Sequence, residues 1–125
     1  MIIKLTPQES EEYFYNALCN GLDYMGGYGL RMDYSKEHYD QAKVKLIEPC
    51  YEDILMQILR DGNTFGFTDI EGEGSYNIQI TLEDVHNKMS NVDPNRLLEM
   101  INGDDDAITA DVILQTVFYD EVIFG

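Results

Sequence analysis

Residues 64–82 read TFGFTDIEGEGSYNIQITL, and this stretch decides the fold class. Apolar and polar side chains alternate at both of its ends, first around Phe65 and Phe67 and then from Tyr76 onward. Alternation with a period of two is typical of a β-strand that buries one face. The segment 71–74 between the two runs supplies the glycines of a turn. The stretch therefore predicts an antiparallel hairpin.

A lone hairpin is only marginally stable in water, so this one must pack on helices or gain a strand. Ile2–Leu5 is the candidate for a third strand. Before the hairpin, apolar residues recur at spacings of three and four, which predicts helices. We expect helices over 7–25, from Ser35 to about Glu48, and from Pro49 to a stop at Gly62. The glycine- and tyrosine-rich segment 26–34 is expected to be a connection.

After the hairpin, Thr81 and Asp84 have the spacing of a capping box and predict a short helix to about Met89. Another helix is expected from Asp93-Pro94 to Asn102-Gly103. For 109–119 the spacing favours a helix, although its many β-branched residues leave a strand as an alternative. The sequence thus predicts a single helix-rich α+β domain over 1–125, with one antiparallel hairpin packed on helices.

The charge of the chain is strongly unbalanced: eight basic residues stand against 24 acidic ones, a formal net charge of −16. From Asn63 onward there are 13 acids and only Lys88 and Arg96 as bases. Such a field repels nucleic acid and anionic lipid and favours a basic partner. We therefore expect no direct nucleic-acid binding, no membrane binding and, where there is a protein partner, a basic one.

The location expected from the sequence is the cytoplasm. No apolar run approaches the roughly 18 residues that would span a bilayer, and residues 1–7 do not form a secretory signal. The chain has two cysteines, Cys19 and Cys50. We expect them to be reduced and packed as small apolar residues. A nucleophile pair of either thiol with His38 or His86 is left open, because such partners meet only in the fold.

Three motifs resemble parts of known sites, but none predicts a cofactor, a metal or a catalytic residue. Segment 69–74 resembles the start of a calcium-binding loop, but Ile80 stands where a glutamate ligand is needed, so a hairpin turn is the better interpretation. The glycines of 26–29 follow a predicted helix, whereas a phosphate-binding loop precedes one. The acids 104–106 are expected to cap the last helix rather than to hold a cation.

Tyrosines and acidic residues are the features of the sequence that indicate a protein interface. Six of the nine tyrosines lie in the first 40 residues, and large amphipathic rings in or beside a loop are typical of a protein interface. The residues expected to contact a partner are Tyr24, Tyr28, Tyr34, Asp69, Glu71, Glu73, Asp104, Asp105 and Asp106.

The sequence favours a small cytosolic protein that acts through protein–protein contact, self-association included, and that is not an enzyme. One alternative is an acidic mimic of nucleic acid, which would occupy the basic surface of a nucleic-acid-binding protein and would need its carboxylates in one continuous ridge. A second is a small enzyme or metal-binding protein whose site the sequence does not reveal. In size, acidity and lack of motifs the chain resembles many proteins of bacteria, phages and mobile elements.

Overall fold

The computed structural model describes residues 2–125. Six α-helices, one 3₁₀ turn and three strands lie in this range. In chain order they are α1 (Pro7–Gly27), β1 (Leu30–Asp33), α2 (Lys36–Lys43), α3 (Tyr51–Arg60), β2 (Phe65–Asp69), β3 (Ile78–Ile80), α4 (Leu82–Lys88), the 3₁₀ turn η1 (Met89–Asn91), α5 (Pro94–Ile101) and α6 (Ala107–Tyr119). The predicted α+β class is confirmed.

The three strands form one antiparallel sheet in the order β1-β2-β3, so β2 is central. The β2–β3 pair is the predicted hairpin, with Phe65 opposite Ile80. The prediction of a strand at Ile2–Leu5 is wrong, because the third strand is β1, inside the segment expected to be irregular. Four residues are too few for a clear period, and β1 is fixed by its pairing with β2, which the sequence does not display.

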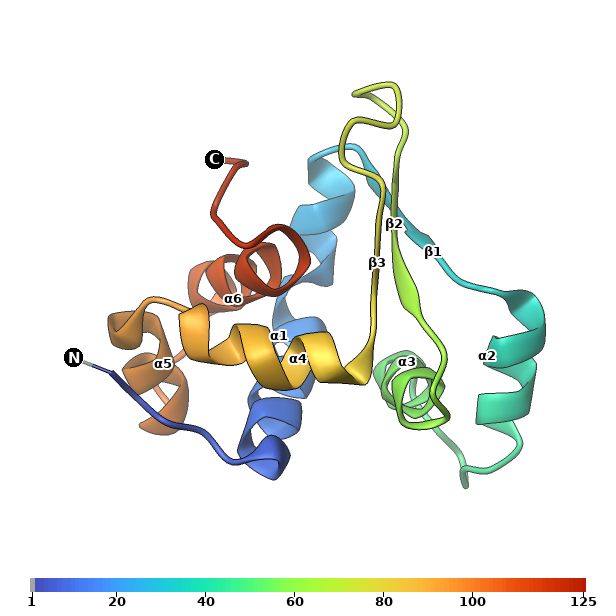
Figure 1. Cartoon of the computed structure of the whole chain (residues 1–125), viewed down its shortest axis with the longest axis horizontal. Coiled ribbons are helices and arrows are strands. Elements are labelled where there is room, and N and C mark those ends of the chain that lie inside the picture. Colours follow the sequence, from blue (N-terminus) through green and yellow to red (C-terminus); the bar gives the residue numbers. More distant parts are fainter. Residues whose placement is uncertain (1) are drawn as a thin grey trace.

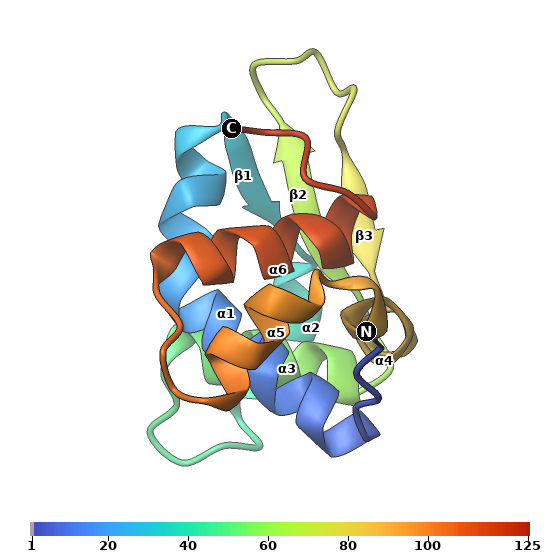
Figure 2. The same cartoon turned by 90° about the vertical axis from the view of Figure 1, so that its left-hand side faces the viewer.

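Helices α1 and α6 pack on each other and cover one face of the sheet (Figures 1 and 2). Their backbones come close at Gly21, where an added Cβ would lie 3.0 Å from the Cβ of Ala110. The largest side chains of the core meet between these helices and β2, and all are fully buried: Phe14, Phe65, Phe67 and Phe118. The other face of the sheet carries exposed polar side chains such as Arg31 and Gln79. Burial of one face explains the alternation in the sequence.

The helix starts follow their capping residues closely. In α1, Thr6 and Glu9 bond reciprocally, each backbone N–H donating to the other's side chain at 2.9 and 3.1 Å. Thr81 caps α4 as predicted. Asp106 caps α6, which begins two residues before the predicted 109 and is a helix, so the strand alternative is wrong. No helix within residues 2–125 is long and apolar enough to cross a membrane.

The second and third helices differ from the prediction at their junction. Helix α2 ends at Lys43, not near Glu48, and α3 begins at Tyr51 with Cys50 as its N-terminal cap residue, not at Pro49. Residues 44–49 instead turn the chain, with Glu48 at a φ of 46°. The residue before Pro49 is therefore left-handed and not extended, and α2 ends at a turn that starts several residues before the proline.

Asp61 joins the α2–α3 turn to the end of α3. Its Oδ1 accepts hydrogen bonds from Lys45 Nζ and Gln57 Nε2, both at 2.8 Å. The bond from Lys45 lowers the pKa of the Asp61 carboxyl, burial opposes this, and Gln57 adds to the lowering. The charged form is thus favoured in the folded protein, which offsets the unfavourable position of an acid at a helix C-terminus.

We predict that Asp61→Asn lowers the free energy of unfolding by about 1 kcal/mol at pH 7, a value kept small because Lys45 is half exposed. A carboxyl whose pKa is lower in the folded state stabilises the folded protein at any pH above its unfolded-state pKa of about 3.9. This stabilisation is lost as the pH falls through the pKa of the folded state. The difference between variant and wild type should therefore shrink below about pH 4. Urea unfolding across pH measures it.

The matched control for this prediction is Asp40→Asn. Asp40 forms an ion pair with Lys36 at the same 2.8 Å, but the two side chains are 55% and 88% exposed. We expect a change within about 0.5 kcal/mol for this variant, because exposed ion pairs contribute little. Equal losses in the two variants, or a loss in Asp61→Asn that persists at low pH, would contradict the assignment.

Candidate functional site

The last turns of α1 present two tyrosines around a pocket. Tyr24 and Tyr28 are one helical turn apart, so their rings share a face, with centroids 6.5 Å apart. With Asp23 and Gly27 they line an open pocket of about 280 Å³. A Cβ at Gly27 would meet no atom within 4 Å, so this glycine leaves open space beside the rings. Tyr24 is 41% exposed and forms the outer wall.

Tyr28 is the fixed wall of the pocket. Its hydroxyl donates to Asp111 Oδ2 of α6 at 2.8 Å. Its ring stacks on Phe124, with centroids 4.9 Å apart and planes at 11°. Burial, followed by the hydrogen bond to Asp111, raises the pKa of Tyr28 to about 12, so the phenol stays neutral at physiological pH. The ring is therefore a rigid, uncharged surface with a carboxylate beside it.

Gln115 holds the C-terminal segment in place and so positions Phe124. The Gln115 side chain is fully buried. Its Oε1 accepts the backbone N–H groups of Ile123 and Phe124, both at 2.8 Å, and its Nε2 donates to the Phe124 carbonyl and to Asp111 Oδ1, both at 3.1 Å. One amide thus organises both the ring and the carboxylate that contact Tyr28.

The aromatic contacts continue to the β2–β3 connection. Phe124 lies 5.1 Å from Tyr76 and 5.9 Å from Tyr119, in edge-to-face geometry. Tyr119 donates its hydroxyl to the Tyr76 carbonyl at 2.8 Å. Burial raises the pKa of Tyr119 to about 12. The end of α6, the C-terminal segment and the β2–β3 connection therefore form one packed unit next to the pocket.

The three acids predicted in the β2–β3 connection differ in their roles. Asp69 is 5% exposed, and its carboxylate accepts the backbone N–H groups of Gly72 at 2.7 Å and Tyr76 at 3.2 Å. It is used in shaping the connection and is not part of the exposed acidic surface. Glu71 and Glu73 are exposed, and the Glu71 side chain lies over Gly29, at the end of α1.

The acids 104–106 lie at the opposite end of α6 from this unit (Figure 2). Asp106 caps α6 by accepting the backbone N–H of Thr109 at 2.9 Å, which is the main cause that lowers its pKa. Asp105 accepts a hydrogen bond of 3.5 Å from Asn20 of α1. Because α6 has 13 residues, its two ends lie about 20 Å apart. Asp111 lies on α6 between these ends, and Asp23 lies on α1.

Tyr34 belongs to a different cluster. It follows β1, whereas Tyr28 precedes that strand. Its ring stacks on Tyr39 with centroids 5.1 Å apart, and its hydroxyl accepts a hydrogen bond of 3.3 Å from Tyr51. The structure thus brings Tyr24 and Tyr28 together and places Tyr34 elsewhere. Phe124, Asp111 and Gln115 were missed, because nothing in the sequence shows which helix faces the tyrosines.

The ion pairs leave most of the negative charge uncompensated. Among residues 2–125, five of the 24 acidic side chains pair with a basic one, which leaves 19 without an ion pair. The paired acids are Glu11, Asp40, Asp61, Glu99 and Asp120. Asp23, Glu71 and Asp111, near the pocket, belong to the group without an ion pair. A cationic ligand would therefore meet carboxylates there whose charge no basic side chain compensates.

The thiols and histidines do not form the nucleophile pair that the sequence left open. Cys50 contacts the hydroxyl of Tyr15, and His86 bonds to Glu11 at 2.9 Å. Within residues 2–125, no group of three or more His, Cys, Asp or Glu side chains has the arrangement of a metal site. Comparisons with models of protein families, with curated proteins and with solved structures find no match to this chain.

Proposed function

We propose that the protein acts by binding a basic segment of another protein. The contact surface is the aromatic–acidic face, which consists of Asp23, Tyr24, Tyr28, Glu71, Asp111 and Phe124. The single observation that carries the proposal is the pocket in which two tyrosine rings stand beside Asp23. Aromatic walls with unpaired carboxylates at their edge suit a cation on an apolar stem.

Arginine is the side chain that fits this chemistry best. Its planar guanidinium stacks on aromatic rings and donates in a fork to carboxylates, whereas a lysine ammonium is a compact, strongly hydrated charge. Tyr24 offers an exposed ring face, Asp23 adjoins it on α1, and Asp111 holds the neighbouring Tyr28. The net charge of −16 would attract such a segment from a distance and speed association.

The test uses a short peptide of alternating arginine and serine, titrated into isotope-labelled protein and followed by NMR at low and high salt. We expect the largest shifts at residues 23–28 and weaker binding at high salt. The double variant Asp23→Asn, Tyr24→Ala should lose at least about fivefold in affinity, and an otherwise identical lysine peptide should bind more weakly.

The matched control is Asp33→Asn, Tyr51→Ala. It removes the same charge and a tyrosine of similar exposure, 37% for Tyr51 against 41% for Tyr24, at the other aromatic cluster. Its affinity should equal that of wild type, with circular dichroism confirming that both variants fold. Shifts spread evenly over all acidic surfaces, with equal affinities for the two double variants, would mean attraction by net charge alone and would overturn the proposed site.

Mimicry of nucleic acid remains the second proposal, and one observation favours it. Asp105 contacts Asn20 of α1, Asp111 bonds to Tyr28, and Glu71 lies beside Gly29, so acids without an ion pair adjoin the second half of α1 and the residues after it at several points. This proposal requires that a bound basic protein be displaced by duplex DNA and that neutralising Asp105 and Glu71 weaken binding as much as changes at the pocket do. Binding that depends on residues 23–28 alone would exclude it.

A further inference from the structure

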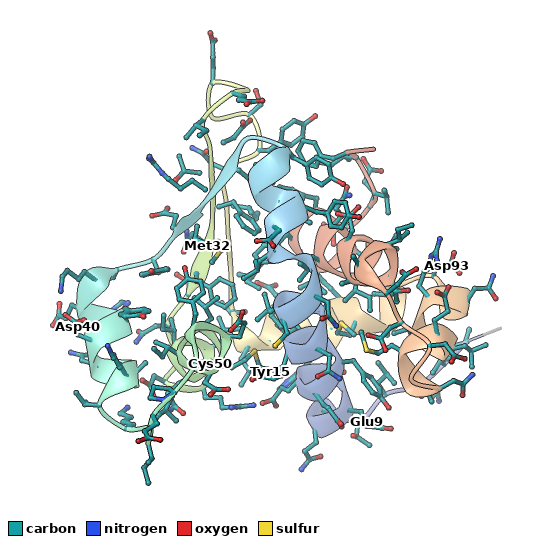
Figure 3. The ribbon with its side chains drawn as sticks, turned by 180° about the vertical axis from the view of Figure 1, so that it is seen from behind. Glu9, Tyr15, Met32, Asp40, Cys50 and Asp93 are labelled. Carbon is teal, nitrogen blue, oxygen red and sulfur yellow. The ribbon has the colours of Figure 1, made fainter. Side chains whose placement is uncertain are left out.

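The two cysteines of the sequence converge on one tyrosine. Cys19 lies on α1 and Cys50 immediately before α3, and both residues are exposed. Cys50 Sγ is 3.5 Å from the hydroxyl oxygen of Tyr15, which comes from the middle of α1. Figure 3 shows Tyr15 and Cys50 facing each other between the two helices. Tyr15 and Cys50, which are 35 positions apart in the chain, thus meet at a contact between α1 and the start of α3.

The hydrogen bonds around Tyr15 fix the direction of this contact. Tyr15 donates its single hydroxyl proton to Asp53 Oδ1 at 2.8 Å. The same oxygen then accepts from the thiol of Cys50, because a phenol has only one proton to donate. Asp53 Oδ2 also accepts the backbone N–H of Cys50 at 3.1 Å, in the capping arrangement of α3. Cys50 is therefore held in place against α1.

Cys19 lies one helical turn after Tyr15 and on the same face of α1. Burial raises the pKa of the Cys19 thiol, the Tyr15 hydroxyl lowers it, and Glu52, Cys50 and Asp53 raise it further. The bonds with Cys50 and Asp53 raise the pKa of Tyr15, with a smaller contribution from Cys19. Because the Tyr15 hydroxyl contacts Cys50 and Cys19 lies on the next turn of the same face of α1, the two cysteines lie at one contact between α1 and the start of α3.

We propose that Cys19 and Cys50 form a dithiol site that becomes an intramolecular disulfide by exchange with a small disulfide such as oxidised glutathione. The Cys50 thiolate attacks one glutathione sulfur, forms a mixed disulfide and releases the first glutathione thiolate. The Cys19 thiolate then attacks the Cys50 sulfur and releases the second. Two electrons pass to glutathione, and the two thiol protons end on the two glutathione thiols.

This site is independent of the proposed binding function. The disulfide would link α1 to the start of α3, away from the face that carries Tyr24 and Tyr28, and its formation requires no partner protein. Both cysteines are exposed, so the expectation that they pack as small apolar residues is wrong. The proposal adds that their reaction with each other depends on the fold.

The test equilibrates the whole protein with defined ratios of reduced and oxidised glutathione, in buffer and in concentrated urea. Acid quenching and mass spectrometry then measure the fraction of intramolecular disulfide. We expect the effective concentration of the two thiols to be at least about tenfold higher in the native protein than in urea. An equal or lower value in the native protein would overturn the proposal.

The matched control moves one thiol around α1. Cys19→Ser, Asn20→Cys keeps two cysteines in the chain but places one on a neighbouring face of the helix. We expect this variant to form mixed disulfides with glutathione and at least about tenfold less intramolecular bond in buffer, with an unchanged value in urea. Equal yields in wild type and control, or covalent dimers as the main product of wild type, would also overturn the proposal.

Discussion

Phe118→Ala is expected to destabilise the protein by about 3–5 kcal/mol, the cost of removing a large buried aromatic side chain. Phe118 of α6 is 1% exposed. Its ring lies 4.6 Å from that of Phe67, 6.0 Å from Phe65 and 6.1 Å from Phe14, measured between centroids. It therefore joins α6, β2 and α1, and the cavity left by its removal would border all three.

The measurement is urea unfolding followed by circular dichroism, with Ile108→Ala as the control on the same helix. Ile108 is 52% exposed and should cost less than about 1 kcal/mol. A domain of this size has about 5–15 kcal/mol of stability in total, so Phe118→Ala should leave it marginal. A loss below about 1.5 kcal/mol would mean that the core repacks around the gap and that Phe118 is not central.

The parts of the fold that could be predicted are those whose signal is local. The periods of the hairpin and of α3, and the caps at Thr6, Thr81 and Asp106, depend on residues a few positions apart. Strand β1 depends on β2, more than 30 residues later in the chain, because β2 is the one strand with which its four residues pair. A strand was therefore expected in the wrong segment.

The candidate site also has one part that could be predicted from local sequence and another that could not. Tyr24 and Tyr28 share a face because they are one helical turn apart, and this can be read from the sequence. The stacking of Phe124 on Tyr28 depends on Gln115. The buried side-chain amide of Gln115 accepts the backbone N–H groups of the residues eight and nine positions later. Asp69, as an acidic residue in a predicted turn, is expected to be exposed, but the β2–β3 connection that it shapes buries it. Both outcomes follow from hydrogen bonds that only the folded chain defines.

The structure of the sheet leads to the second large effect, which concerns Gly66. This buried residue lies in the central strand, opposite Asp33 of β1 and Gln79 of β3. A Cβ at Gly66 would overlap the carbonyl oxygen of Ile78. Because that oxygen belongs to the backbone, no side-chain rotation can relieve the clash, and β3 would have to move away from β2.

We predict that Gly66→Ala destabilises the protein by about 3 kcal/mol, as overpacking and the loss of β2–β3 hydrogen bonds combine. Hydrogen exchange of the amides in 78–80 should accelerate more than that of α1 amides. The matched control is Gly26→Ala, where the added Cβ meets no atom within 4 Å and φ is not positive, so about 0.5–1 kcal/mol of stabilisation is expected. If Gly66→Ala instead keeps wild-type stability and exchange, the close approach of β3 to Gly66 does not exist in solution, and the packing of the hairpin described above is incorrect.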